Sequence, residues 1–299
     1  MSTQIFDCDV AVIGGGFGGV AAALAAAEAG RVVVMSEPTD WIGGQVTSQA
    51  VSALDEHRYI ETFGGTHSYY RFREGVRAAY LERFGGPDLM PDGQPLNPGN
   101  GWVSRLCFEP RAGLRVLEDL LAGHVAEGRL KVLLNHAPHS VDARGGRIQQ
   151  VRLSTPGGGL AVVRASIFLD ATELGDLLAL AQVPYACGAE AVEDTGEPHA
   201  ATDGPHPERV QSFTTCFIAE HRPGENHTIR KPFGYEAWRE TQPFTLTLRT
   251  REGNPNRFYM FAGDLPFWTY RRVLDAQLFA ESVFEAPPRG ELALINWDK

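Results

Sequence analysis

The sequence predicts an α/β fold built on a parallel sheet, and three observations lead to this prediction. An apolar run over residues 9–13 passes through the glycine-rich stretch GGGFGG into an alanine-rich helix over residues 19–29. A second apolar run over residues 31–35 follows that helix directly. A later apolar strand over residues 166–169 opens into small and acidic residues. Strands that alternate with helices in this way are typical of a parallel sheet.

Composition and charge narrow the class of protein. The chain has 299 residues, of which 43% are hydrophobic and 21% charged, so it can build one large or two moderate domains. We expect one domain over residues 1–185 and a second, partial α+β domain over residues 186–299. The formal charge of −10 comes without a basic run, which argues against nucleic acid and anionic membranes as partners.

Cysteines and histidines give no support to a metal centre. Cys8, Cys107, Cys187 and Cys216 form no CxxC pair, and no histidines have the HxxxH or HExxH spacing. We therefore expect no metal and no disulfide framework, with buried thiols in a reducing cytoplasm.

The uncharged stretch from Val10 to Ala27 has the length of a membrane span. Acidic residues flank it, whereas a secretory signal begins with basic residues, so neither a membrane span nor a targeting signal is expected.

The stretch GGGFGG is better explained by a bound phosphate. Gly14 lets the chain turn sharply out of the strand, Gly16 leaves space for a pyrophosphate, and Gly19 lets the helix pack closely on the sheet. Gly18 lies in the same motif and is also a candidate binding residue. The free N–H groups and the dipole at the helix start face an anion. A tight turn without any ligand is the alternative interpretation.

An acidic residue follows at the spacing that ribose recognition requires. Seventeen residues separate Gly19 from Glu37, which stands after the second apolar run. A carboxylate there accepts hydrogen bonds from a ribose 2′-OH and disfavours a 2′-phosphate. The sequence therefore predicts a Rossmann-like dinucleotide-binding domain.

The middle of the chain reads as further helices and strands. WIGGQVTSQ, with Gly43, Gly44, Gln45 and Ser48, is either a second backbone approach to the ligand or a plain surface turn. We expect helices over residues 68–83 and 111–124, a long loop over 85–101 and a strand over 130–134. Three antiparallel strands should follow, over residues 137–143, 147–154 and 160–165.

The strand over residues 166–169 ends in DATELGD, and a helix over 174–181 follows. A parallel sheet presents its carboxyl edge to a ligand in this way, although Asp170 or Thr172 could simply cap the helix. Beyond Pro184, strands are expected over 211–220 and 244–250 and a helix over 267–284.

These motifs together resemble the FAD-dependent oxidoreductases of the glutathione-reductase-like flavoprotein superfamily. GGGFGG, WIGGQVTSQ, GWVSRLCFEP, DATELGDLL and INW occur in the same order. The resemblance implies that FAD is the cofactor. It also implies that Gly14, Gly16 and Gly19 hold the pyrophosphate, Glu37 the ribose, and Gly43, Gly44 and Gln45 the stretch toward the flavin. By the same resemblance, Val141 is a backbone partner for adenine, and Ala171 and Thr172 lie beside the dinucleotide; Ser48 is a further candidate.

The late segment that closes the flavin site in this superfamily has no counterpart before Lys299. We therefore expect a C-terminally truncated form that binds FAD poorly or not at all until the missing end is restored.

The expected function is transfer of hydride or electrons between a small organic substrate and FAD. No spacing selects a catalytic acid or base among His57, His67, Tyr69 and Arg105. An NAD-dependent dehydrogenase, a non-catalytic remnant of a flavoprotein and a transferase with a reactive cysteine stay open as alternatives. The substrate, the electron acceptor and the oligomeric state are not specified by the sequence.

Overall fold

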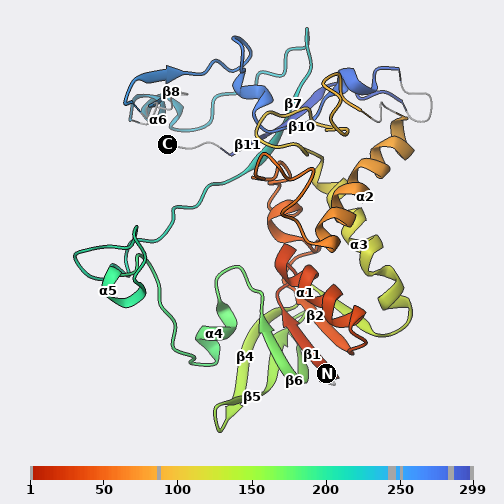
Figure 1. Ribbon diagram of the computed structural model, residues 1–299, viewed down its shortest axis with the longest axis vertical. Coiled ribbons are helices and arrows are strands. Elements are labelled where there is room, and N and C mark those ends of the chain that lie inside the picture. The colour runs from red at the N-terminus through yellow and green to blue at the C-terminus, as the bar shows by residue number, and fades with distance from the viewer. Residues whose placement is uncertain (1–2, 86–88, 242–246, 250–251, 282–285, 297–299) are drawn as a thin grey trace. The chain divides into compact units, whose positions relative to one another are not determined.

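The computed structural model describes residues 3–85, 89–241, 247–249, 252–281 and 286–296 (Figure 1). The chain forms two compact units, one from Met1–Asp40 and His124–Thr215 and the other from Trp41–Gly123 and Cys216–Lys299. Each unit thus combines two separate stretches of chain. The continuous domains expected over residues 1–185 and 186–299 stay a prediction.

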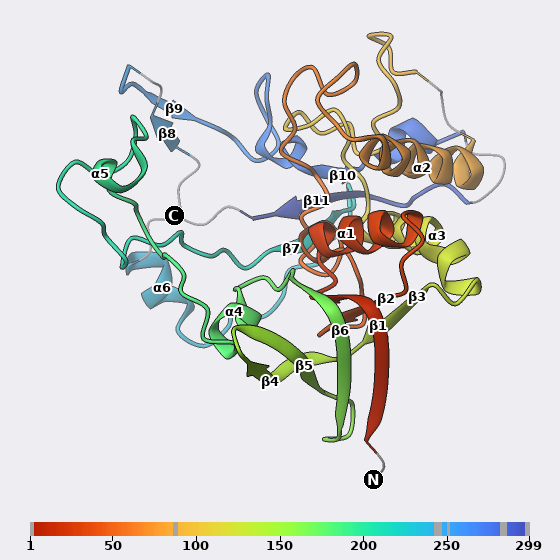
Figure 2. The ribbon, with the colours of Figure 1, turned by 60° about the horizontal axis from the view of Figure 1, so that its bottom comes forward.

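The first unit is built on a six-stranded sheet with the strand order β3-β2-β1-β6-β5-β4, shown in Figure 2. Strands β3, β2, β1 and β6 are parallel, and β5 and β4 continue the sheet in antiparallel pairing. The strands are β1 (Gln4–Ile13), β2 (Val33–Glu37), β3 (Leu130–Leu134), β4 (Ala137–Arg144), β5 (Arg147–Ser154) and β6 (Leu160–Asp170). This mixed α/β sheet confirms the predicted fold class.

Three helices belong to this unit: α1 (Phe17–Glu28), α4 (Asp176–Leu180) and α5 (Val192–Thr195). Helix α1 packs on β1 and β2, with Val20, Ala23, Leu24 and Ala27 buried. Apolar side chains that project from the strands of this sheet form a core, which includes Ala11, Ile13, Val34, Val151, Leu153 and Val163. Burial of these side chains, at about 25 cal/mol per Å² of apolar surface, holds the strands in register.

The register brings three strand ends to one edge. Ile13 pairs with Ser36 on one side and with Asp170 on the other. Because these strands are parallel, the residues that follow β1, β2 and β6 all emerge at the same carboxyl edge. That edge is where a ligand is expected.

Strand β6 corrects one prediction. The strands expected over residues 160–165 and 166–169 form a single strand. Strand β1 is ten residues long, and it pairs with β6 in one constant register from Gln4↔Ala161 to Ile13↔Asp170. Since no turn residue interrupts the segment, the long partner holds it straight.

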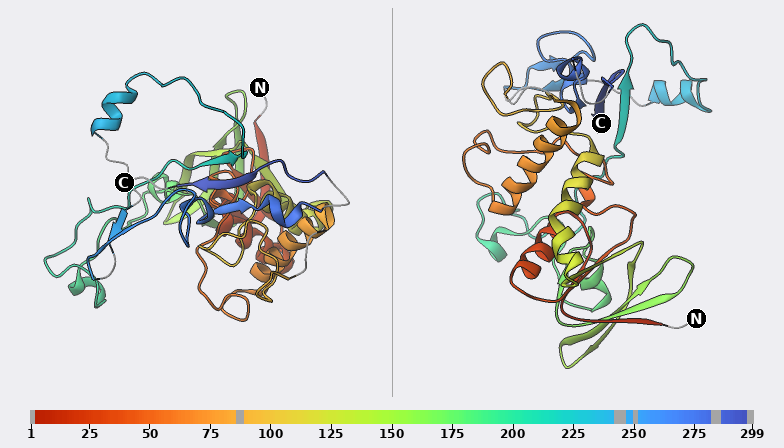
Figure 3. Two further views of the ribbon diagram at one scale, coloured as in Figure 1. Left: turned by 90° about the horizontal axis from the view of Figure 1, so that it is seen from above. Right: turned by 90° about the vertical axis from the view of Figure 1, so that its right-hand side faces the viewer.

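The second unit contains α2 (His67–Phe84), the greater part of α3 (Pro110–Ala126), and α6 (Tyr235–Thr241). Helices α2 and α3 lie side by side (Figure 3), and a Cβ at Gly75 would be only 2.7 Å from Cγ1 of Val116. Two antiparallel sheets complete the unit, with the orders β10-β11-β7 and β8-β9. Their strands are β7 (Phe217–His221), β8 (Thr247–Arg249), β9 (Pro255–Arg257), β10 (Arg272–Leu274) and β11 (Glu291–Ile295).

The helix expected over residues 267–284 is wrong. The described part of this segment consists of two 3-10 turns, Phe267–Thr269 and Ala276–Phe279, on either side of β10. Strand β10 pairs with β11, and the Asp275 carboxylate accepts a hydrogen bond from the Gln277 N–H. These tertiary and local bonds override the weak helical pattern. Residues 282–284 lie outside the described residues.

The other late predictions are confirmed only in part. The strand expected over 211–220 is the shorter β7, and of the strand expected over 244–250 residues 247–249 form β8 while the rest lie outside the described residues. Across the described ranges, no helix combines the length and apolarity that crossing a bilayer requires.

Candidate functional site

The turn between β1 and α1 depends on glycine at position 14. Gly14 has φ +107°, and a Cβ there would lie 2.1 Å from the Ala171 carbonyl oxygen. Its N–H donates to the Ser36 carbonyl at 3.1 Å, and the Ala171 N–H donates to Ile13 at 2.8 Å. The turn is therefore fixed on both sides by the neighbouring strands.

The next glycines clear the start of helix α1. A Cβ at Gly19 would lie 2.1 Å from the Gly14 carbonyl oxygen, so only glycine lets the helix approach the turn. Gly16 is the N-cap and no side chain caps it by a hydrogen bond. Around Gly18 there is open space, with nothing within 4 Å of a Cβ. No side chain caps this helix start, as is typical of anion sites at helix N-termini.

Glu37 is the buried acid of the turn, with an exposed fraction of 4%. Its Oε2 accepts a hydrogen bond from the Gly15 N–H at 3.1 Å, and its Oε1 accepts from the Thr39 N–H at 2.9 Å and the Thr39 hydroxyl at 2.7 Å. A carboxylate oxygen has two lone pairs, so Oε2 can accept one more donor. The side chain thus ties β2 to the glycine turn and keeps capacity for a hydroxyl group.

The DATELGD segment caps a helix, which was the structural alternative for it. The Asp170 carboxylate accepts from the Thr172 N–H and hydroxyl and from the Leu178 N–H, at 3.0, 2.7 and 2.9 Å. The Thr172 hydroxyl oxygen in turn accepts from the Asp176 N–H at 2.7 Å. These bonds hold Ala171 and Thr172 beside Gly14.

Glu173 is a neighbour of the turn that the sequence gave no reason to select. Its Oε1 lies 2.9 Å from the position of a Cβ at Gly16. The signal was its place in DATELGD, directly after Thr172. The side chain is exposed, so water screens its charge.

The loop that contains Gly43, Gly44 and Gln45, called the GGQ loop here, belongs to the second unit. Gly43 has φ +102°, and a Cβ there would lie 2.6 Å from Cδ1 of Leu117. The Thr47 hydroxyl donates to the Ile42 carbonyl at 2.6 Å, and the Ser48 hydroxyl to the Gly44 carbonyl at 3.3 Å. Gln45 is exposed, in a 3-10 turn that spans Gly44–Val46. The loop is therefore a firmly held turn in which Gly43 packs on its own unit.

Val141 lies on β4, the edge strand of the first unit's sheet. It pairs with Val151 and packs against the core. Strand β4 is three places from β1 in the strand order, about 14 Å at the usual spacing of neighbouring strands. Val141 is the candidate that stands apart from the glycine turn within this unit.

One of the four candidate acids and bases, Tyr69, contacts a buried carboxylate in the second unit. The Tyr69 hydroxyl and the Ser104 hydroxyl both donate to Glu56, Ser104 at 2.7 Å. Burial, followed by this hydrogen bond to Glu56, raises the pKa of the Tyr69 phenol above its ordinary value. Tyr69 therefore stays protonated at neutral pH. His57 lies beside Glu56 in the chain, and its Nδ1 accepts from the Tyr59 N–H at 3.2 Å.

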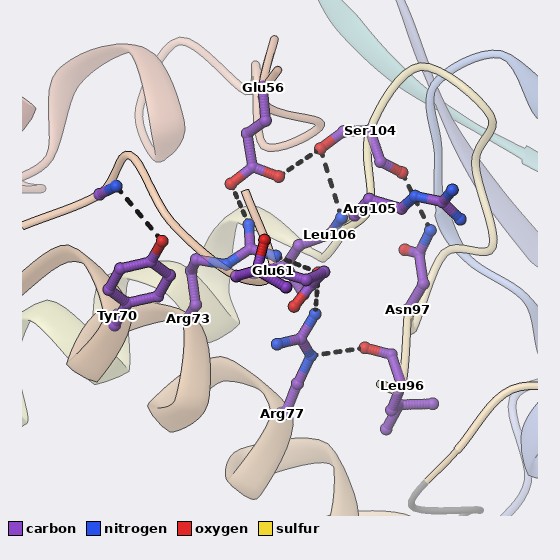
Figure 4. A network of polar contacts seen from close by, with 12 residues as sticks. Glu56, Glu61, Tyr70, Arg73, Arg77, Leu96, Asn97, Ser104, Arg105 and Leu106 are labelled. Atoms are coloured by element: carbon purple, nitrogen blue, oxygen red, sulfur yellow. Dashed lines mark hydrogen bonds and ion pairs between the residues drawn. The ribbon is translucent and has the colours of Figure 1, made fainter. Parts of the chain in front are cut away.

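Glu56 belongs to a four-membered ion cluster (Figure 4). Arg73 of α2, only 1% exposed, pairs with Glu56 and Glu61, and Arg77 pairs with Glu61 at 2.7 Å. Two guanidinium groups thus balance two carboxylates. His67, the first residue of α2, is exposed, and Arg105 is 49% exposed and forms an ion pair with Asp92 at 3.6 Å.

The cysteines differ in burial, which corrects the expectation of four buried thiols. Cys107 is buried, Cys8 and Cys216 are half-buried, and Cys187 is exposed because it lies in a polar, irregular stretch. Burial raises the pKa of the Cys8 thiol to about 11 and that of Cys107 to about 12. Within the described residues, no group of His, Cys, Asp and Glu side chains is arranged to hold a metal ion.

Thiol labelling should follow this order. At pH 8 the native protein should react with iodoacetamide first at Cys187 and last at Cys107, because the thiolate is the reactive form and access is required. Raising the pH toward 11 should speed labelling of Cys8, whose thiolate fraction grows tenfold per pH unit below its pKa. Peptide mass spectrometry over time measures both rates. Equal rates at Cys107 and Cys187 in the folded protein would contradict this order.

Comparison with known proteins identifies the family. Residues 9–283 match the model of a family described as FAD dependent oxidoreductase. No curated protein matches the chain. Among solved structures, Mycobacterium smegmatis Sdh1 in complex with UQ1 is 18% identical, with 55% of this chain and 33% of that chain covered and a TM-score of 0.36. The chain therefore spans about a third of that protein's length.

Two further solved structures are similar over a comparable part of the chain. Thermovibrio ammonificans THI4 is 17% identical, with 62% of this chain and 67% of that chain covered and a TM-score of 0.36. A geranylgeranyl bacteriochlorophyll reductase-like protein from Thermoplasma acidophilum is 21% identical, with 56% and 40% covered and a TM-score of 0.34. The family match, which covers most of the chain, decides the assignment. The chain belongs to the FAD dependent oxidoreductase family, and its cofactor is FAD.

Proposed function

We propose that the β1–α1 turn holds the FAD pyrophosphate and that the protein uses FAD to oxidise or reduce a small organic substrate. The observation that supports this proposal is the glycine turn itself. Gly14 and Gly19 leave no room for a Cβ, and no side chain caps the helix at Gly16. The backbone of the helix start is thus left uncapped, which suits a diphosphate, with the carboxylates of Glu37 and Glu173 beside Gly15 and Gly16.

The acid and the neighbouring backbone fit the rest of an adenosine diphosphate. Glu37 holds the Gly15 N–H and keeps one lone pair on Oε2 for a ribose hydroxyl. Its negative charge repels a 2′-phosphate. When bound, FAD supplies the hydride or electron chemistry, and the protein supplies position and electrostatics.

The proposal also assigns further contacts to FAD, supported by the resemblance of the motifs. Ala171 and Thr172 would face the dinucleotide from the end of β6, and Val141 would offer backbone to the adenine. Gly43, Gly44, Gln45 and Ser48 would lie along the cofactor toward the flavin. The catalytic acid or base is left unassigned.

The test is an absorbance spectrum of the purified protein with and without added FAD, followed by mass analysis of what denaturation releases. Flavin bands and a released mass of FAD support the proposal. Release of NAD would favour the nicotinamide-dependent alternative. Folded protein that binds no dinucleotide, and that no electron donor reduces, would favour the non-catalytic alternative.

Glu37→Gln should weaken FAD binding roughly tenfold or more, because a charge-assisted hydrogen bond to a ribose hydroxyl is lost. The fold should survive with a loss of about 1–3 kcal/mol, because the single amide oxygen can accept from the Gly15 N–H or from Thr39 but not from both. Titration of FAD fluorescence measures the Kd. Glu28→Gln, at an exposed acid of α1, is the matched control and should leave the Kd unchanged. Equal affinities for wild type and Glu37→Gln would exclude the assigned role.

A further inference from the structure

The second unit contains a cavity that the flavin assignment does not use. Its volume is about 660 Å³. Glu56, His57 and Arg58 form one wall, residues between Met90 and Arg105 form the other, and Leu278 contributes from a later segment. A volume of this size suits a small organic molecule.

The second wall is held rigid by one amide side chain. Asn97 donates to the carbonyls of Gly101 and Ser104 at 3.2 and 3.1 Å and accepts from the Cys107 N–H at 2.8 Å. Asn97 has an exposed fraction of 9%, so these bonds are shielded from water. Because this wall is already fixed, little conformational entropy is lost when a ligand binds.

The buried carboxylate at the cavity adds little negative potential. Glu56 accepts hydrogen bonds from Tyr69 and Ser104 and pairs with Arg73, so its charge is compensated. Figure 4 shows the contacts with Ser104 and Arg73. Glu61 is compensated in the same cluster by Arg77. The remaining charges of the lining decide which ligand is attracted.

Those remaining charges are mainly positive. Arg58 and Arg105 carry guanidinium groups, and Asp92 is the carboxylate that opposes them. The side chains of Arg105 and Asp92 are 49% and 60% exposed, and their nearest nitrogen and oxygen atoms lie 3.6 Å apart. Such an exposed ion pair is weak. Across the described ranges, Arg58 forms no ion pair; its guanidinium carbon lies 4.5 Å from the centroid of the Tyr59 ring. A stacked guanidinium without an ion pair is ready to take a planar anion.

The lining also offers apolar surface. Met90, Pro91, Pro95, Trp102, Val103 and Leu278 contribute to it. The Trp102 ring is oriented by its N–H, which donates to the Pro266 carbonyl at 3.3 Å, and by the Tyr270 ring at 4.4 Å between centroids. A ligand with only polar groups would leave this apolar surface in contact with water.

We propose that this cavity binds a small organic carboxylate with an apolar body, and that the Arg58 guanidinium binds the carboxylate group. The site lies within one unit and requires no flavin. It is therefore tested by binding alone, and its failure would leave the proposed FAD site unaffected.

Benzoate is the probe, and benzamide, its neutral counterpart of the same shape, is the control ligand. Saturation-transfer NMR titrations of the purified full chain should give a Kd of about 1 mM for benzoate, as expected for a ligand of so few atoms. Benzamide should bind at least tenfold more weakly, because a charge-assisted hydrogen bond is roughly twice as strong as a neutral one.

Arg58→Gln should weaken benzoate binding tenfold or more and leave the weak binding of benzamide unchanged. Arg115→Gln removes the same charge from α3, where Arg115 is 62% exposed and does not line the cavity, and should bind benzoate as wild type does. Because Arg58 is exposed, its replacement should leave the circular dichroism spectrum unchanged. Absence of saturable benzoate binding, equal binding of benzamide, or undiminished binding by Arg58→Gln would each overturn the proposal.

Discussion

Replacing Gly14 with alanine should destabilise the first unit by about 4 kcal/mol and abolish FAD binding. The new Cβ would lie 2.1 Å from the Ala171 carbonyl oxygen and 2.6 Å from the Thr172 nitrogen, so the backbone that follows β6 would have to move. Alanine would also have to adopt φ +107°, which L residues rarely do. Both effects act on the same turn.

Gly18→Ala is the matched control, four residues along the same motif. Nothing lies within 4 Å of a Cβ at Gly18, and this residue is in the first turn of α1. The change should therefore stabilise the protein by about 0.5–1 kcal/mol. Urea unfolding measures both variants. Wild-type stability and FAD affinity in Gly14→Ala would show that the turn does not have the described geometry.

Arg73→Met should destabilise the second unit by about 3–5 kcal/mol, because it leaves Glu56 and Glu61 without their shared buried cation. Methionine fills a similar volume, so lost packing contributes little. Denaturant unfolding at pH 7 measures the difference.

Arg115→Met is the control for this prediction. Arg115 pairs with Glu82 at 3.4 Å, and both side chains are more than 60% exposed. Such pairs contribute about 0–1 kcal/mol, so this variant should unfold close to wild type. If Arg73→Met and Arg115→Met were equally stable, the buried cluster would contribute no more than a surface pair.

Local motifs predicted the first unit well. Gly14, Gly19 and Glu37 were selected by spacing, and the structure places all three at one turn. Their roles depend on backbone conformation and on neighbours within one strand–turn–helix segment, which the sequence encodes directly. Helices α2 and α3 were predicted within two residues at each end, because their apolar residues repeat at helical spacing.

Long-range packing accounts for what the sequence did not reveal. Arg73 looked like one more charge on an amphipathic helix, and only folding brings Glu56 and Glu61 to it. Strand β10 forms because β11, about twenty residues later, pairs with it. The residues of β6 that look like two strands are joined by a partner near the N-terminus. Neither the hydrophobic periodicity of a segment nor a local sequence motif indicates which distant segment it pairs with.

The pairing of β1 with β6 has a consequence for synthesis on the ribosome. Gln4 meets Ala161, more than 150 positions later, so the central ladder cannot close until that distant stretch has been translated. At ordinary elongation rates the nascent N-terminus waits roughly ten to thirty seconds with one apolar edge unpaired. A holdase that covers nascent chains should therefore raise the yield of native protein.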